Sequence, residues 1–168
     1  MAISTEETVR GVVVQAIHAI AQEGLGFDTP NGNVKGYLLD YEHPAKVRQY
    51  LMASVGARQQ IQAWGVMVSA ADVFVGTGGL VQRTYTIVVE GYYDLGLEGA
   101  GINSILVAAR RIAAQLKNIG TSLYQTVDFV SNPVFESPQV VPSGIEKNSG
   151  QMVKARITYT ASRKNPNF

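Results

Sequence analysis

The chain has no cysteine and only two histidines among its 168 residues. The lack of cysteine excludes disulfide bonds, thiolate catalysis and zinc–thiolate sites. His18 lies on the edge of an apolar helical repeat, and His43 precedes a proline in a predicted turn, so we interpret both as structural. With so few imidazole and thiol ligands, we expect no transition-metal site, and nothing in the sequence predicts another cofactor.

Charged residues are also scarce. They make up 16% of the chain, against about 25% in typical soluble domains. The formal net charge of +1 gives no reason to expect binding to nucleic acid or membranes through overall electrostatics, although a local basic patch stays open. Two interpretations of the low fraction of charged residues remain: partner subunits cover part of the surface, or the surface is neutral and rich in Ser, Thr, Gln and Asn.

Long apolar runs are missing as well. No stretch approaches the roughly 18 apolar residues of a membrane-spanning helix. The acidic Glu6 and Glu7 stand where a signal peptide would be basic. We therefore expect neither a membrane span nor a signal peptide.

The common catalytic and nucleotide-binding motifs are incomplete. Residues 99–104 (GAGINS) resemble the start of a dinucleotide-binding loop, but the third glycine and a later ribose-binding carboxylate are missing. Residues 76–79 (GTGG) lack the Lys-Ser/Thr ending of a phosphate-binding loop, and no Gly-x-Ser-x-Gly elbow occurs. Asp40 and Glu42 are interpreted as part of a solvated turn. The sequence thus predicts no catalytic residue and no enzymatic activity.

The clearest positive signals are a strand and the amphipathic helix that follows it. Residues 82–93 place Tyr85, Ile87 and Val89 on one face and polar residues on the other, the period expected of a sheet that is wet on one side. Residues 102–116 repeat apolar side chains at the 3.6-residue spacing of a helix laid on a core.

Weaker patterns predict the other elements. A helix is expected over 5–22, after a capping box formed by Ser4 and Glu7. A strand over 60–69 is apolar on both faces toward its end, which predicts a central strand or one covered twice. The remaining expected elements are a short extended piece at 34–41, a short helix at 45–55, and strands at 124–130 and 151–160.

Together these patterns predict one α+β domain over residues 1–168. It has a mainly antiparallel sheet of about four strands, with two main helices packed on one face. We expect irregular loops at 70–80, 94–101 and 131–150, and a frayed tail at 161–168. The segment at 131–150 is long for a loop in a compact domain, and such loops tend to be functional or mobile.

Five segments in a fixed order carry a family resemblance. They are GYLLDY at 36–41, QAWGVMV at 62–68, RTYTIVVEGYY at 83–93, the helix at 102–116 and the strand at 152–160. The arrangement spans most of the chain and is similar to tail-terminator and neck (tail-completion) proteins of tailed bacteriophages.

The resemblance implies a structural protein of the virion, made in the host cytoplasm and located at the tail–neck junction. It implies a homo-oligomeric ring of six copies that caps the head-proximal end of the tail tube, stops tube polymerisation and joins the tail to the head connector. The implied partners are further copies of the chain, the tail tube protein, the neck and connector proteins and, where the particle has one, the tail sheath. DNA would only pass through the lumen. The family offers no catalytic residue to transfer.

Alternative functions stay open at this point. One is another neck, head-closure or tail-completion role. Another is a small-ligand-binding α+β domain that uses the glycine loop before Ile102. A nucleic-acid-binding module is disfavoured, because the charge is near neutral and no basic aromatic cluster occurs.

The candidate subunit and partner interface is drawn from the loops and the helix. Residues 73–75 are unusually apolar for a loop, and the helix has a second, weaker apolar face at Val107, Ala108 and Ala114. The candidate interface residues are Val73, Phe74, Val75, Leu95, Leu97, Val107, Arg111, Val134 and Phe135.

Overall fold

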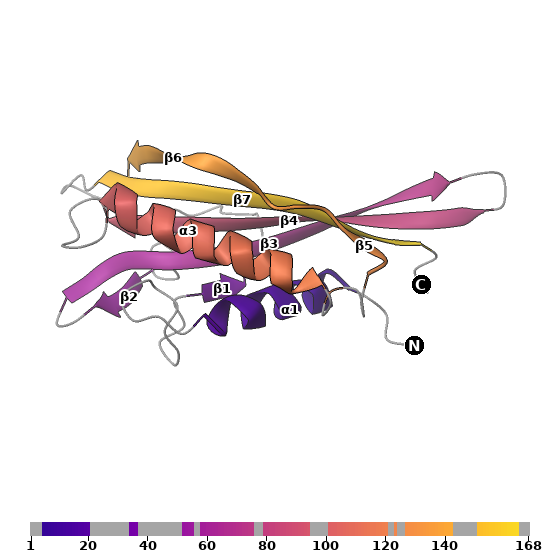
Figure 1. The fold of residues 1–168 in the computed structure, drawn as a ribbon, viewed down its shortest axis with the longest axis horizontal. Coiled ribbons are helices and arrows are strands. Elements are labelled where there is room, and N and C mark those ends of the chain that lie inside the picture. The colour runs from indigo at the N-terminus through magenta and orange to yellow at the C-terminus, as the bar shows by residue number, and fades with distance from the viewer. Residues whose placement is uncertain are drawn as a thin grey trace.

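The computed structural model describes residues 5–20, 34–36, 52–55, 58–75, 79–94, 101–120, 123, 127–142 and 151–164. Across these ranges the chain forms two layers, a sheet and two helices that lie on one of its faces (Figure 1). The helices are α1 (Glu6–His18) and α3 (Gly101–Asn118). The strands are β1 (Val34–Gly36), β2 (Met52–Val55), β3 (Arg58–Val75), β4 (Leu80–Asp94), β5 (Phe129–Val130), β6 (Val134–Pro142) and β7 (Gln151–Lys164). The predicted α+β class is confirmed.

The strands within the described ranges form one seven-stranded sheet, more than the four or so strands expected. The order is β1-β3-β4-β7-β5, with β2 also paired to β3 and β6 also paired to β7. Every pairing is antiparallel except the short parallel pair of β1 with β3. The three long strands β3, β4 and β7 therefore form the centre of the sheet.

Helix α1 begins one residue later than the capping box predicted. Thr5, rather than Ser4, is the N-cap, and its side-chain oxygen accepts a hydrogen bond from the backbone N–H of Thr8 at 3.1 Å. The helix ends at His18, where the N–H of Ala19 still bonds to the carbonyl of Gln15 at 3.0 Å. The buried side chains of α1, spaced as one helical stripe, are Val9, Val13, Ala16 and Ile17.

Helix α3 confirms the predicted amphipathic pattern and extends it by a few residues. Its buried side chains lie on one stripe against the sheet, and its exposed ones lie on the opposite side. Ala108, which was predicted to lie on a second, outward face, is fully buried and belongs to the core stripe. Val107 and Ala114 are exposed, as predicted. The buried residues of α3 are Ile105, Ala108, Ala109, Ile112 and Leu116.

The predicted loop over 70–80 is wrong for most of its length. Strand β3 continues to Val75 and β4 starts at Leu80, so the two strands stay paired as a long ribbon up to a short connection. Gly79 has φ 69°, the left-handed backbone region that favours glycine, which fits a turn immediately before β4. The glycines that suggested a loop therefore mark only the tip of a hairpin.

Two other predicted irregular segments contain strand. Residues 134–142 form β6 along β7, with a bulge between Glu136 and Gln139. Residues 161–164, predicted to fray, are the paired end of β7. That end is held because Asp128 Oδ2 accepts a hydrogen bond from the backbone N–H of Lys164 at 2.6 Å, and Ala161 is fully buried.

Three weaker predictions change in detail. Only residues 129–130 of the strand expected at 124–130 are described as strand (β5). Residues 52–55, predicted to be the end of a short helix at 45–55, instead form β2, which pairs with the start of β3. Residues 45–51 lie outside the described ranges. The expected extended piece at 34–41 is strand at 34–36, and its remainder also lies outside them.

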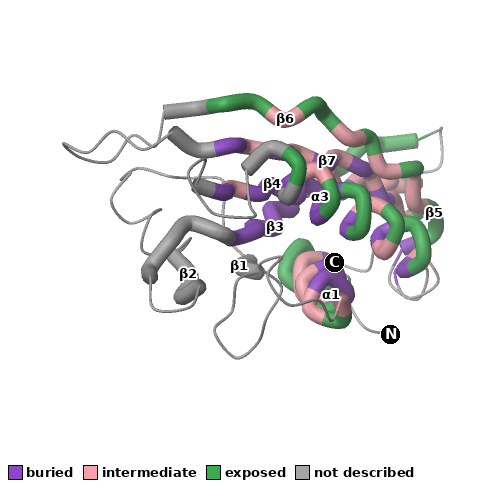
Figure 2. Tube along the Cα trace, turned by 60° about the vertical axis from the view of Figure 1, so that its left-hand side comes forward, coloured by how far each residue is buried: buried purple, intermediate pink, exposed green. Residues whose placement is uncertain are grey.

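The core lies between the sheet and the two helices (Figure 2). Trp64 on β3 is fully buried; its Nε1–H donates to the Tyr93 hydroxyl at 3.2 Å, and the two rings meet edge to face. The indole packs over Gly91 so closely that a Cβ there would lie 2.6 Å from three of its ring carbons. The prediction that residues 60–69 form a strand with both faces covered holds for the stretch from Ala63 to Val68, which is buried throughout.

Candidate subunit interface

One end of the central ribbon extends well past the helices (Figure 1). We call this part, residues 69–75 of β3 and 79–84 of β4, the arm. Four large apolar side chains near its tip are exposed, with Phe74 at 78% and Val73 at 56% of their full surface. Val75 and Leu80 are the other two. The arm therefore shows solvent the kind of side chain that usually lies in a core or an interface.

The arm is braced at its base. Arg83 donates from Nε to Asp72 Oδ1 at 2.7 Å and from Nη2 to Asp72 Oδ2 at 2.8 Å, a two-point ion pair between directly paired residues. These hydrogen bonds lower the pKa of Asp72 and raise that of Arg83. On the other side, Glu6 Oε1 of α1 accepts from the backbone N–H of Ala70 at 2.8 Å. The base is thus tied to the body, whereas no such contact to the body is seen for the tip within the described ranges.

The base of the arm also borders an open hollow of about 380 Å³, lined by Thr5, Glu6, Ala70, Asp72 and Arg83. Its charged groups are already engaged with one another or with the backbone. Among its described lining residues, the Glu6 and Asp72 carboxylates thus each accept a hydrogen bond already.

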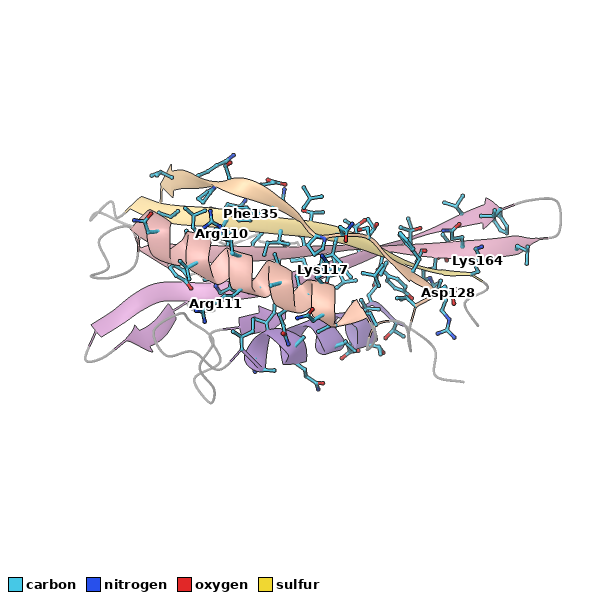
Figure 3. All side chains as sticks on the ribbon, in the orientation of Figure 1. Arg110, Arg111, Lys117, Asp128, Phe135 and Lys164 are labelled. Carbon is cyan, nitrogen blue, oxygen red and sulfur yellow. The ribbon has the colours of Figure 1, made fainter. Side chains whose placement is uncertain are left out.

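The other candidate interface residues are spread over different elements. Val107 (43% exposed) and Arg111 lie on the exposed side of α3, and Val134 is exposed at the start of β6. Phe135 is half-buried and packs against the core from β6, between that strand and α3 (Figure 3). Leu95 and Leu97 lie outside the described residues. The structure thus gathers residues 73–75 on the arm but does not join them to the rest.

A buried ionic cluster on the face opposite the helices was not predicted from the sequence. Glu90, only 3% exposed, lies with Oε1 at 2.8 Å from Arg156 Nε and 3.3 Å from Lys154 Nζ. Its Oε2 accepts from the Tyr92 hydroxyl at 2.6 Å. The pattern placed Glu90 on a wet face; the missing information was its register opposite Arg156, where a polar position on β7 supplies the counter-charge.

The contacts of this cluster tie neighbouring strands of the sheet together. Each carboxylate oxygen of Glu90 is already paired, and the two cations are only partly exposed. Tyr159, in the core, has a buried hydroxyl without a hydrogen-bond partner among the described residues, and burial raises its pKa. Neither feature provides a nucleophile that is poised beside a free base.

Metal and membrane signals are also missing from the part of the chain that the structure describes. Within it, no group of three or more His, Cys, Asp or Glu side chains is placed to hold a metal ion. No described helix is long and apolar enough to cross a bilayer. No protein-family model matches the chain, and no curated protein matches it.

Proposed function

We propose that the chain is a structural virion protein of the tail-terminator kind, which forms a ring at the head-proximal end of a phage tail. In this role it stops the tail tube from growing and joins the tail to the head connector. The proposal starts from the family resemblance of the sequence. The α+β fold, with both helices on one face of a mainly antiparallel sheet, is a rigid scaffold that can present contact surfaces to partners.

The arm is the observation on which the proposal depends. An exposed apolar ribbon contributes little to a lone subunit, because its side chains stay in water. In a ring the same side chains would be buried against a neighbour or against the tube. Phe74 and Val73 are the most exposed of these residues, so the arm supports a function based on contact between proteins.

Ring closure explains how such a protein would stop growth. A head-to-tail contact closes into a ring when the rotation between subunits completes a circle, and otherwise continues as a filament. A terminator also needs one face that fits the tube and another that refuses further tube subunits. The described residues hold exposed apolar side chains on the arm, on α3 and on β6, which is enough for more than one contact surface.

The function is tested in phage particles. Particles are produced without the protein and viewed by electron microscopy, and the copy number and position of the protein are measured in the complete particle. A terminator predicts six copies at the tail–neck junction and overlong tails in its absence. Tailless heads beside normal tails would instead assign a head-joining role. Unchanged particles from a strain that lacks the protein would refute both roles.

A further inference from the structure

We propose that the arm pairs edge to edge with strand β6 of a second copy of the chain, so that the sheet continues from one subunit into the next. This inference deepens the proposed function, because it names the two surfaces that form the ring. It depends on how hydrogen bonds, apolar side chains and charges are distributed over the two edges of the sheet.

The first observation concerns the outer edge of β3. Among the described residues, its outer-edge partners end at Ile61 for β2 and at Val66 for β1. Farther along, the Ala70 N–H points away from β4 and bonds to Glu6 instead. Successive residues of a strand point their backbone groups to alternate sides, so Asp72 and Phe74 direct theirs to this same edge. Within the described ranges, nothing pairs with them.

The second observation is that, among the described residues, the other side of the same sheet also ends in an unpaired strand edge. Strand β6 pairs with β7 and with no other strand among the described residues. Pro138 and Pro142 interrupt its backbone donors and leave a short stretch, residues 139–141, free to pair. Val140 in this stretch is 48% exposed. Prolines of this kind limit uncontrolled edge pairing while leaving room for one short, specific contact.

The third observation is that neither pairing stretch carries an unpaired charge. Residues 73–75 and 80–82 of the arm contain no ionisable side chain, and neither do residues 137–142 of β6. Joining the two stretches would therefore bury apolar surface without stranding an unpaired charge. The nearest charge on the arm, Asp72, is already neutralised by Arg83.

These observations select a second copy as the occupant. An open strand edge is satisfied best by another open strand edge, the mode known as β-augmentation. The chain carries two such edges on opposite sides of its sheet, so a head-to-tail arrangement uses both in every subunit. Pairing of one arm with another arm would use only one and stop at a dimer.

Because the natural chain has no cysteine, single introduced thiols can map this contact directly. Three exposed valines are replaced one at a time: V73C on the arm, V140C on β6, and V107C on α3 as the matched control. Pairs of purified variants are mixed and treated with a short bismaleimide. The expected result is a covalent dimer from V73C mixed with V140C, and a ladder from the double variant. V107C should give no product with either.

A second experiment measures assembly rather than proximity. V73D and V140D should each weaken self-association at least about tenfold, as expected for a charge forced into the centre of an interface. V107D, the same change on α3, should leave self-association unchanged, because the edge pairing assigns no contact between copies to α3 and leaves Val107 to other partners. The thermal stability of the subunit should be the same in all three variants, because each valine is exposed.

The outcomes separate this inference from the proposed function. A ring that forms without the V73C–V140C product, or a V73C variant that cross-links to itself, would overturn the edge pairing and leave the virion function standing. Loss of tail-tube binding in V73D with the ring intact would assign the arm to the tube instead and overturn the inference. The mixed product from a protein that is absent from phage particles would support the edge pairing and refute the virion function.

Discussion

The same strand, β3, lies in two different environments. From Ala63 to Val68 it is buried on both faces beneath and beside its neighbours, whereas from Ala71 to Val75 it is exposed at every position. The backbone pairing with β4 continues unbroken through both stretches. The β3–β4 hydrogen bonding is therefore common to body and arm, and the two stretches differ in the burial of their side chains.

This difference separates residues that hold the fold from residues that are available to partners. A two-stranded ribbon alone is marginal in water, so the body must anchor the arm. The Glu6 carboxylate on Ala70 ties the arm to α1, and the ion pair of Arg83 with Asp72 holds the two strands of the arm together at its base. We therefore expect that substitutions of buried residues in the body will destabilise the subunit, whereas substitutions at the tip of the arm will change only its association with other copies.

The largest expected effect is at Trp64. The W64A variant should lose about 3–5 kcal/mol of unfolding free energy, the range for deleting a large aromatic side chain from a core. It also removes the partner of the Tyr93 hydroxyl and the edge-to-face contact of the two rings. Denaturant unfolding followed by circular dichroism measures the change. A loss below about 1 kcal/mol of unfolding free energy would mean that the body does not depend on the burial of this side chain.

Gly91 should give the next largest effect. In G91A the new methyl group would lie 2.6 Å from the indole of Trp64, and the surrounding core must move, at a cost of about 1–3 kcal/mol. Gly11 on α1 provides a matched control, because a Cβ there meets nothing within 4 Å. G11A should stabilise the protein by about 0.5–1 kcal/mol, since alanine favours a helix over glycine. If G91A and G11A changed the unfolding free energy in the same direction, the close packing of Trp64 on Gly91 would be contradicted.

The next effect in size is expected at the Glu90 cluster, where E90Q should lower the unfolding free energy by about 1–3 kcal/mol. The substitution removes the carboxylate that neutralises Arg156 and Lys154, but both cations are partly exposed and can turn to water. E136Q changes a carboxylate opposite the same arginine, on exposed β6, and should alter stability by less than about 0.5 kcal/mol. Equal effects of the two variants would show that the burial of Glu90 adds nothing.

Sequence patterns predicted the elements whose signal is local. The 3.6-residue repeat of α3 and the alternation of β4 need no distant partner, and both are confirmed with small changes of boundary. The α+β class follows from the order of such elements. Ala108 was misplaced because small residues carry little hydrophobic signal, and only the packing of α3 on the sheet shows which side it occupies.

Several other errors concern pairing between separate parts of the chain. Nothing local shows that Asp72 meets Arg83, so the glycines nearby suggested a loop where the ribbon continues. The end of β7 depends on Asp128, and the burial of Glu90 depends on Arg156. Of the candidate interface, the apolar residues 73–75 were singled out from the sequence, but their position on one projecting arm needed the structure.

A smaller effect is expected from pH at the base of the arm. The pKa of Asp72 lies below its ordinary value of 3.8, chiefly because of the hydrogen bonds from Arg83. A lowered pKa in the folded state adds stability above the ordinary value, and that stability is lost as the pH falls through the folded pKa. D72N should therefore be slightly less stable than the natural protein near neutral pH and equal to it well below pH 3.8. A difference that does not change with pH would exclude this ion pair as its source.

The smallest effect on stability is expected at the tip of the arm. Phe74 has nearly the size of Trp64 but is 78% exposed, so F74S should change the unfolding free energy by less than about 0.5 kcal/mol. The same variant should shift the protein from assembled to single subunits, measured by native mass at matched concentration, because the ring would lose an apolar contact. Measured beside W64A, this variant tests most directly whether the body holds the fold while the arm serves association. A loss of 2 kcal/mol or more in F74S, on the order of a core deletion, would show that the arm packs on its own subunit and is not held free for a neighbour.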